Sequence, residues 1–252
     1  MQTRRSDEEV SLPIRRDALA VWGRMMLVVA GISLLAAVLI SARLLTAGEE
    51  QPVAGTEQPA VEEDTATATA TVLPPGVARI GIVAGHAGYD PGAVCPDGWS
   101  EADLTKVIAQ EVQELLIRKG YHVDLLEEFD TQLTDYRAQA LVSIHADSCE
   151  VPGASGFKVA RVTDSAIPEA EDLLVACLYQ EYQAATELPR HPSSITDNMT
   201  SYHAFREIDR STPGAIIEVG FLLGDRDLLV SRPKLVARGI AAGVVCFLEE
   251  AE

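Results

Sequence analysis

The sequence has little positive charge: 20 Lys and Arg residues stand against 38 Asp and Glu residues, and the formal net charge is −18. A surface this acidic repels phosphate backbones, so it argues against nucleic acid as a partner and against a basic patch for anionic polymers. The sequence also lacks an internal repeat and any sign of a second globular module. Solubility alone explains the charge, which therefore identifies no substrate.

Charged residues are absent from residues 25–42, MMLVVAGISLLAAVLISA. A run of about 18 apolar residues is near the lower limit for a helix that spans a membrane. Five Arg residues precede the run and two Glu residues follow it, which predicts a single-pass anchor over residues 25–45, with residues 1–24 in the cytoplasm and the rest outside. The alternative is a signal peptide cleaved near Ala47 and Gly48. Both interpretations predict export across the cell membrane.

An apolar period is absent from residues 46–76, which are rich in Ala, Thr, Pro, Glu and Val. Such a composition buries too little surface to offset the entropy of ordering, so we expect a flexible linker here. Residues 77–252 remain, and this length is sufficient for one domain with a single core.

Strand and helix patterns alternate along residues 77–252. The hydrophobic periods predict strands over 78–84, 123–126, 140–144, 156–162 and 215–219, and long helices over 101–119, 168–188 and 233–250. Ser100 is a suitable N-cap for the first helix, and Gly120 a suitable stop. The alternation predicts an α/β domain with a twisted, mostly parallel sheet flanked by helices on both faces.

Four polar residues follow or end these elements on what should be the same edge of the sheet. His86 follows the first expected strand, His145 follows the third, and Glu218 lies near the end of the last. Glu101 opens the first long helix, which begins at that edge because it follows the first strand. Ligands of open α/β sheets gather outside the carboxyl ends of the strands. We therefore expect two imidazoles and two carboxylates to meet at one rim.

Two neutral His side chains and one carboxylate, with a fourth position open, form a common catalytic zinc site. Such a metal lowers the pKa of bound water and polarises a carbonyl group. A second carboxylate is then needed to take the proton of the water and pass it to the leaving amine. Glu218 suits this task, although the residues alone leave the roles of Glu218 and Glu101 exchangeable. Taken singly, each residue also has a structural explanation, such as a Glu that complements a helix dipole.

Four segments resemble the conserved blocks of the zinc-dependent N-acetylmuramoyl-L-alanine amidases of the Amidase_3 family. They are GHAGYDPGA, SEADL, SIHAD followed by ASGFKV, and PGAIIEVGFLLGDRDLL, in the order and approximate spacing of the family. The resemblance covers nearly all of residues 77–252. It implies that His86, Glu101 and His145 bind Zn²⁺, that Glu218 is the catalytic carboxylate, and that the substrate is the amide bond between N-acetylmuramic acid and L-alanine in peptidoglycan.

Two segments depart from the family pattern. Val83 stands where the family usually has an acidic residue, three positions before the first His. Residues 123–139, VDLLEEFDTQLTDYRAQ, lack the threonine-arginine signature that is typical after the second strand. Both departures concern the positioning of the substrate and leave the four site residues intact.

The remaining reactive residues admit less specific roles. Cys95 and Cys149 each lie shortly after one of the His candidates, and a disulfide between them is reasonable outside the cytoplasm. Participation of either cysteine in the zinc site is the alternative. Cys177 and Cys246 fall on apolar helix faces and are expected to be buried thiols. His203 is expected to pack or lie at the surface, with orientation of the substrate as the alternative.

Two other functions remain open from the sequence. One is a zinc peptidase on a related scaffold that cuts within the stem peptide. The other is an inactive, tethered protein that binds peptidoglycan and recruits or regulates other hydrolases. The intact His, Glu, His and Glu set favours an enzyme over the second alternative. The expected partners are peptidoglycan and the membrane, and the sequence identifies no protein regulator.

Overall fold

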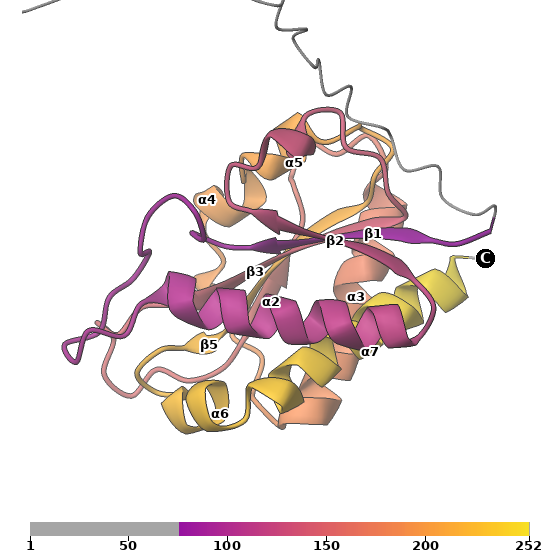
Figure 1. The fold of residues 1–252 in the computed structure, drawn as a ribbon. Coiled ribbons are helices and arrows are strands. Elements are labelled where there is room, and N and C mark those ends of the chain that lie inside the picture. Colours follow the sequence, from indigo (N-terminus) through magenta and orange to yellow (C-terminus); the bar gives the residue numbers. More distant parts are fainter. Residues whose placement is uncertain (1–75, 252) are drawn as a thin grey trace, which may run out of the picture. The chain divides into compact units, whose positions relative to one another are not determined.

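A computed structural model describes residues 76–251 of the chain, which form one α/β unit (Figure 1). Its sheet has five strands in the order β2-β1-β3-β5-β4. The strands are β1 (Arg79–Ala84), β2 (His122–Glu127), β3 (Ala140–Asp147), β4 (Lys158–Ala160) and β5 (Gly214–Phe221). All neighbouring strands are parallel except β4, which runs antiparallel to β5 at the edge. The prediction of a mostly parallel sheet is confirmed.

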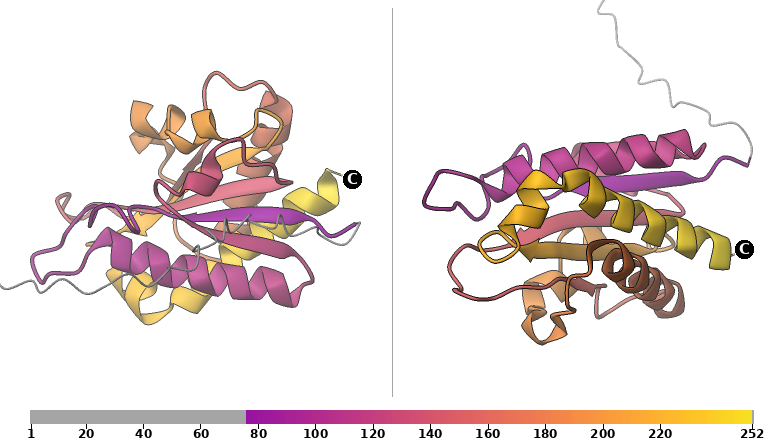
Figure 2. Two further views of the ribbon diagram at one scale, coloured as in Figure 1. Left: turned by 45° about the horizontal axis from the view of Figure 1, so that its top comes forward. Right: turned by 90° about the horizontal axis from the view of Figure 1, so that it is seen from below.

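Three long helices cover one face of the sheet: α2 (Glu101–Arg118), α3 (Pro168–Thr186) and α7 (Pro233–Glu250). The view from below shows α7 between the other two (Figure 2). Alternate residues of the central strands, such as Ile82, Ile144 and Ile217, are fully buried against them. The short helix α6 (Arg226–Ser231) precedes α7 and packs beside it.

The opposite face carries only short elements. These are the 3₁₀ turns at Thr131–Leu133 and Pro192–Ser194 and the single-turn helices α4 (Asp197–Thr200) and α5 (Ala204–Glu207). A smaller core lies beneath them, formed by residues that include Leu133, Leu141, Met199 and Ile216. Helices thus cover both faces, as expected, but none of the short ones was predicted, because four residues are too few to show a helical period.

The structure confirms the residues predicted to begin and end the first long helix. The Ser100 hydroxyl accepts a hydrogen bond from the backbone amide of Asp103 at 3.2 Å, and α2 begins at the next residue. Gly120 follows the end of the helix with a φ of +96°, a conformation that favours glycine. The strand predicted over residues 156–162 is shorter, because only Lys158–Ala160 pairs with β5.

The cysteines form two disulfides. The sequence left a bond between Cys95 and Cys149 open, and the structure contains it. The expectation that Cys177 and Cys246 are thiols is wrong, because they join α3 to α7. These helices pack unusually close: a Cβ at Gly243 would lie 2.8 Å from the Cα of Leu178. The sequence shows an apolar face on each helix but not that the two faces meet.

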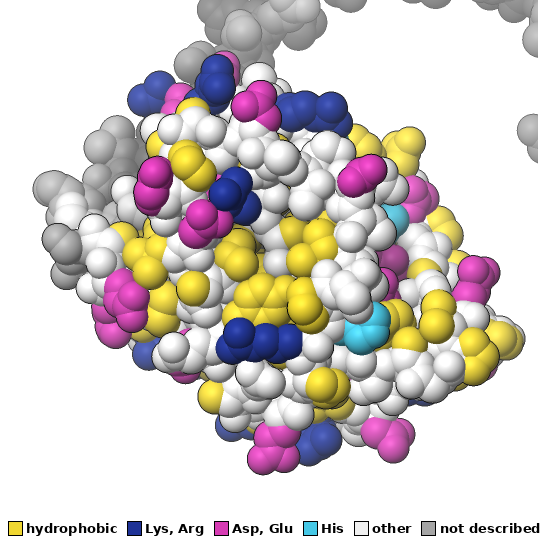
Figure 3. Space-filling model, turned by 180° about the vertical axis from the view of Figure 1, so that it is seen from behind, with side chains coloured by type: hydrophobic (Ala, Val, Ile, Leu, Met, Phe, Trp, Pro, Cys, Tyr) yellow, Lys and Arg dark blue, Asp and Glu magenta, His cyan; other side chains and the backbone are white. Residues whose placement is uncertain are grey.

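No helix among residues 76–251 is long and apolar enough to cross a membrane. The predicted anchor at residues 25–45, the cytoplasmic segment 1–24 and nearly all of the predicted linker lie outside the described residues. On the face seen from behind, Lys and Arg side chains are scattered among acidic ones around an apolar hollow (Figure 3).

Candidate metal centre

The four predicted site residues line one cavity of about 510 Å³ at the carboxyl ends of the strands. His145 on β3 and Glu218 on β5 are paired across the two strands, so their side chains emerge side by side. Both point to the face that carries the short helices, since their neighbours in the strands, such as Ile144 and Ile217, pack against the long ones. His86 and Glu101 reach the same cavity from the loop after β1 and from the first turn of α2.

Glycines allow the loop of His86 to fold tightly against the other site residues. His86 itself has a φ of +63°, which is rare for a residue with a side chain. A Cβ at Gly85 would collide with the ring of His145, and one at Gly92 would lie 2.7 Å from a carboxylate oxygen of Glu101. The glycines of GHAGYDPGA therefore provide the space in which the two His rings and the Glu carboxylate converge.

The nitrogen and oxygen atoms of His86, Glu101 and His145 are close enough to share one metal ion. His86 Nε2 lies 3.4 Å from Glu101 Oε2, and His145 Nδ1 lies 3.1 Å from Glu101 Oε1. Three such ligand atoms lie within 4.8 Å of one another. Burial raises the pKa of Glu101, but hydrogen bonding and charge from the His rings outweigh it and hold that pKa below the usual range. The carboxylate is thus ready to bind a cation.

Asp90 orients the ring of His86. Its Oδ1 accepts a hydrogen bond from His86 Nδ1 at 2.6 Å and another from the backbone amide of Gly92 at 2.7 Å. Donation from Nδ1 leaves Nε2 free to bind a metal, an arrangement that is common in metal sites. Asp90 therefore closes the turn at Gly92 and also holds the ring of the candidate ligand His86.

Glu128 is a site residue that the sequence reasoning missed. One oxygen, Oε2, accepts the backbone N–H of His86 at 2.7 Å and lies 3.6 Å from His145 Nε2. The other oxygen lies 3.0 Å from His203 Nε2. Burial raises the pKa of Glu128, but the bond from His203, the charge of His145 and the other donors bring it down to about 2. A signal existed, because Glu128 directly follows β2, whose carboxyl end lies at the same rim as that of β1.

Glu218 differs from Glu101 in its surroundings. Its Oε2 is enclosed in the protein and has no hydrogen-bond partner. Burial, together with the negative charges of Asp147 and Glu101, raises the pKa of Glu218 to about 7 against the opposing charges of His145 and Lys158. One carboxylate of the cavity is therefore held ionised beside the imidazoles, while the other is poised to exchange a proton near neutral pH.

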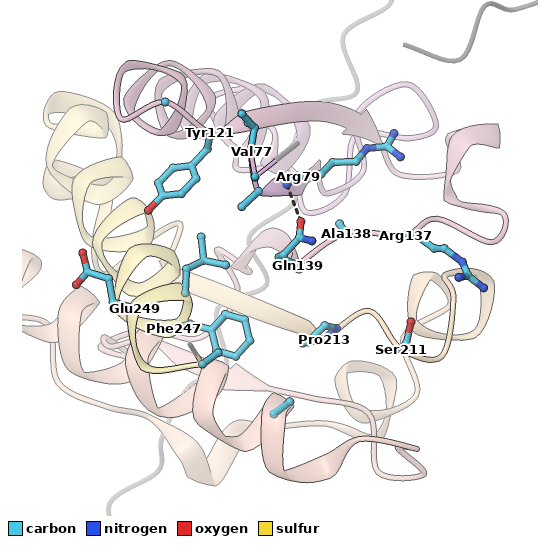
Figure 4. A pocket seen from close by; sticks show the side chains of 16 residues that line it. Val77, Arg79, Tyr121, Arg137, Ala138, Gln139, Ser211, Pro213, Phe247 and Glu249 are labelled. Atoms are coloured by element: carbon cyan, nitrogen blue, oxygen red, sulfur yellow. Dashed lines mark hydrogen bonds between the residues drawn. The ribbon is translucent and has the colours of Figure 1, made fainter. Parts of the chain in front are cut away.

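Another cavity, of about 840 Å³, is larger but lies at the opposite end of the sheet, where the strands begin (Figure 4). Its lining includes Arg79, whose backbone amide donates to the Gln139 side chain at 2.6 Å, and one carboxylate, Glu249. Histidine and cysteine are absent from that lining. The volume of a cavity therefore does not identify the candidate site in this domain. The residues that line the cavity identify it.

Comparisons with known proteins agree with this geometry. Residues 80–246 match the model of the Amidase_3 family, described as N-acetylmuramoyl-L-alanine amidase. The chain is 36% identical over 84 residues to the N-acetylmuramoyl-L-alanine amidase AmiC of Neisseria meningitidis serogroup B, covering 30% of this chain and 20% of that protein. It is 35% identical over 92 residues to a putative N-acetylmuramoyl-L-alanine amidase of Buchnera aphidicola, covering 32% of this chain and 42% of that protein. The matches span less than half the length of either relative.

Solved structures share the fold. The amidase Ami1 of Mycobacterium smegmatis superimposes with a TM-score of 0.58 at 18% identity, over 69% of this chain and 98% of that one. The CwlD amidase of Clostridioides difficile, solved in complex with the GerS lipoprotein, gives 0.54 at 23% identity, over 69% and 99%. The fold, the cavity and a family match over residues 80–246 lead to one conclusion: the chain belongs to the Amidase_3 family of N-acetylmuramoyl-L-alanine amidases.

Proposed function

We propose that this protein hydrolyses the amide bond between N-acetylmuramic acid and L-alanine in peptidoglycan, with one Zn²⁺ ion as cofactor. One observation carries the proposal: the cavity that holds the cluster of His86, Glu101 and His145 also holds the unpartnered oxygen of Glu218. An amide hydrolase needs both parts, a metal site and a separate carboxylate that handles protons. The family to which the chain belongs supplies the substrate class.

The donor set fits zinc rather than a harder cation. Two imidazole nitrogens and one carboxylate match the catalytic zinc sites of known hydrolases, whereas calcium and magnesium prefer sites made only of oxygen. The His86 side chain is 27% exposed on the cavity side, while His145 and Glu101 are nearly enclosed at 8% and 7%. His86 is therefore the most accessible of the three candidate ligands, and we expect a substrate to approach the cluster there.

The residues of the chain have separate tasks in this reaction. When bound, zinc polarises the scissile carbonyl and lowers the pKa of a water molecule. Glu218, whose Oε2 has no competing partner, takes a proton from the attacking water and delivers it to the departing amine of L-alanine. Asp90 and Glu128 hold His86 through its ring and its backbone amide. Such partners keep ligands in a fixed orientation and raise metal affinity.

A digest of purified muropeptides, analysed by mass spectrometry, tests the proposal. The zinc-loaded protein should release stem peptides with a free N-terminal alanine, and a chelator should stop the release. Glu218→Gln should bind zinc but release almost nothing. Cleavage within the stem would instead identify a peptidase. Wall binding without turnover in the unmutated protein would identify a recruiting or regulatory protein.

The location of the enzyme is part of the same proposal. Residues 25–45 would anchor the chain in the cell membrane, with residues 1–24 in the cytoplasm and the catalytic domain outside, on the side where peptidoglycan lies. Protease added to intact spheroplasts should degrade the domain while an N-terminal tag stays protected. A domain released into the medium, without the first residues, would support a cleaved signal peptide instead.

A further inference from the structure

The described domain exposes two aromatic side chains to more than half of their area, and they lie together beside the candidate metal centre. Tyr89 is 68% exposed and Phe129 is 51% exposed. The whole chain has only 5% aromatic residues, and the others among residues 76–251 are buried or half-buried. Since exposed aromatic groups cost solvation without adding to the core, their pairing at this place points to a binding surface.

Three rings form what we call the aromatic ridge: Tyr89, Phe129 and His203. The ring centroids of Tyr89 and Phe129 are 4.5 Å apart in an edge-to-face contact. Phe129 stacks on His203 with centroids 4.1 Å apart and an interplanar angle of 24°. Tyr89 donates its backbone amide to the carbonyl of His86, and His203 lines the same cavity as the site residues. The ridge therefore adjoins the metal centre at its rim.

His203, on which the ring of Phe129 stacks, is held in place by two carboxylates. Both nitrogens of His203 are engaged, with Nε2 3.0 Å from Glu128 and Nδ1 2.9 Å from Glu207. This pair of carboxylates fixes the plane of the ring on which Phe129 stacks. A ligand would lose little free energy in ordering such a surface, because aromatic side chains have few rotatable bonds and these are already restrained.

We propose that the aromatic ridge is a saccharide-binding subsite, which stacks against a sugar ring of the glycan strand beside the scissile amide. This inference rests on the proposed function, since the acyl side of that amide is borne by a sugar. The faces of aromatic rings carry partial negative charge and attract the C–H groups of a neutral sugar ring. The sugar would then be placed at the rim while the amide reaches the metal centre.

Size and charge favour a sugar over larger partners. Two exposed aromatic rings offer about 150–250 Å² each, well below the roughly 800 Å² that each partner contributes to an ordinary protein interface. Asp90 and Asp130 directly follow Tyr89 and Phe129 in the sequence, and the chain has a net charge of −18. An anionic lipid surface would be repelled by these carboxylates, whereas a neutral sugar ring would not.

Binding of an uncharged oligomer of N-acetylglucosamine to the full chain tests this proposal without requiring turnover, because peptide-free glycan strands would carry free lactyl carboxylates. All proteins carry Glu218→Gln, so that nothing is cleaved, and titration calorimetry measures affinity. The ridge variant adds Tyr89→Ala and Phe129→Ala. A matched control adds Ile117→Ala, which is 51% exposed and lies at the far end of α2. Each lost ring contact should weaken binding about two- to tenfold, so the ridge variant should bind at least about fourfold more weakly and the control should bind as before.

Three results would overturn the proposal: no glycan binding by the unmutated ridge, equal binding by the ridge variant, or a ridge variant that loses binding to anionic vesicles instead. Circular dichroism of each variant ensures that a loss does not reflect unfolding. Failure of the proposed function would look different. In that case the protein without Glu218→Gln would release no stem peptides, whatever the glycan titration shows.

Discussion

Replacement of Glu128 by Gln should weaken zinc binding while leaving all three candidate ligands in place. Gln has nearly the same shape but no charge, and only one of its two polar atoms accepts hydrogen bonds. In the native protein both oxygens accept, one from the backbone amide of His86 at 2.7 Å and one facing His203 at 3.0 Å. The variant can keep one of these contacts but must place an amide N–H against the other donor.

The structure sets the size of this effect. Hydrogen bonds to an ionised group contribute about 1.5–3 kcal/mol each when buried, and the Glu128 side chain is only 7% exposed. Removal of a residue that supports metal ligands typically weakens metal binding by about 10- to 100-fold, which corresponds to roughly 1.4–2.7 kcal/mol. The two ranges agree, so we expect the dissociation constant for zinc to rise by about 10- to 100-fold.

Competition with a chromogenic chelator at pH 7.5 measures this constant. Glu127→Gln is the matched control, because it removes the same charge from the neighbouring residue, which is exposed, whereas the contacts with His86 and His145 come from Glu128. The reasoning is refuted if Glu128→Gln binds zinc as tightly as the unmutated protein. It is refuted equally if Glu127→Gln shows the same loss, because the effect would then be one of general charge.

Three further predictions concern the catalytic carboxylate, the core and the disulfides. Glu218→Gln should lower kcat by about 10²- to 10⁴-fold with zinc affinity retained. In the unmutated enzyme, kcat/KM should fall on the acid side as Glu218 gains a proton, with a midpoint at or below about 7 because a bound cation lowers the pKa of Glu218. A midpoint well above 7 would contradict the assignment of Glu218 as the catalytic carboxylate. Glu171→Gln should raise the free energy of unfolding at pH 8 by about 1 kcal/mol, because burial raises the pKa of Glu171 and leaves its Oε2 without a partner. A raised pKa in the folded state means that the stability of the unmutated protein falls as pH rises above about 4. In urea denaturation, the free energy of unfolding should therefore decrease less between pH 5 and pH 8 in the variant than in the unmutated protein. Joint replacement of Cys177 and Cys246 by Ser should lower the free energy of unfolding by about 2–4 kcal/mol, since the bond closes a loop of 69 residues far from the cavity. Activity per folded molecule at 25 °C should stay within about twofold of the unmutated value. A large loss of activity would show that the catalytic site depends on this disulfide.

The sheet could be predicted from the sequence because its cause is local. Buried strands appear in the sequence as short apolar runs. Because these runs alternate with long amphipathic helices, only a few arrangements of the strands in a sheet are possible. The helix over residues 233–250 was predicted with the bounds that the structure has. The single-turn helices α4 and α5 were not predicted, since they are fixed by packing on β3 and β5 rather than by their own period.

The candidate site could also be predicted only in part from the sequence. His86, Glu101, His145 and Glu218 could be brought to one rim from their places at strand and helix ends. Glu128 could have been placed at the same rim from its position directly after β2, but its contact with His203 could not, because His203 lies 75 positions away and precedes a single-turn helix that the sequence did not reveal. The same holds for Cys177 and Cys246, whose pairing depends on which two helices become neighbours on the sheet.

The most direct test of the account is the mass of the products released from muropeptides by the zinc-loaded protein. We predict intact stem peptides with a free N-terminal L-alanine, together with peptide-free sugars, and no release after chelation or in Glu218→Gln. Products cut within the stem, or release that persists without metal, would contradict it.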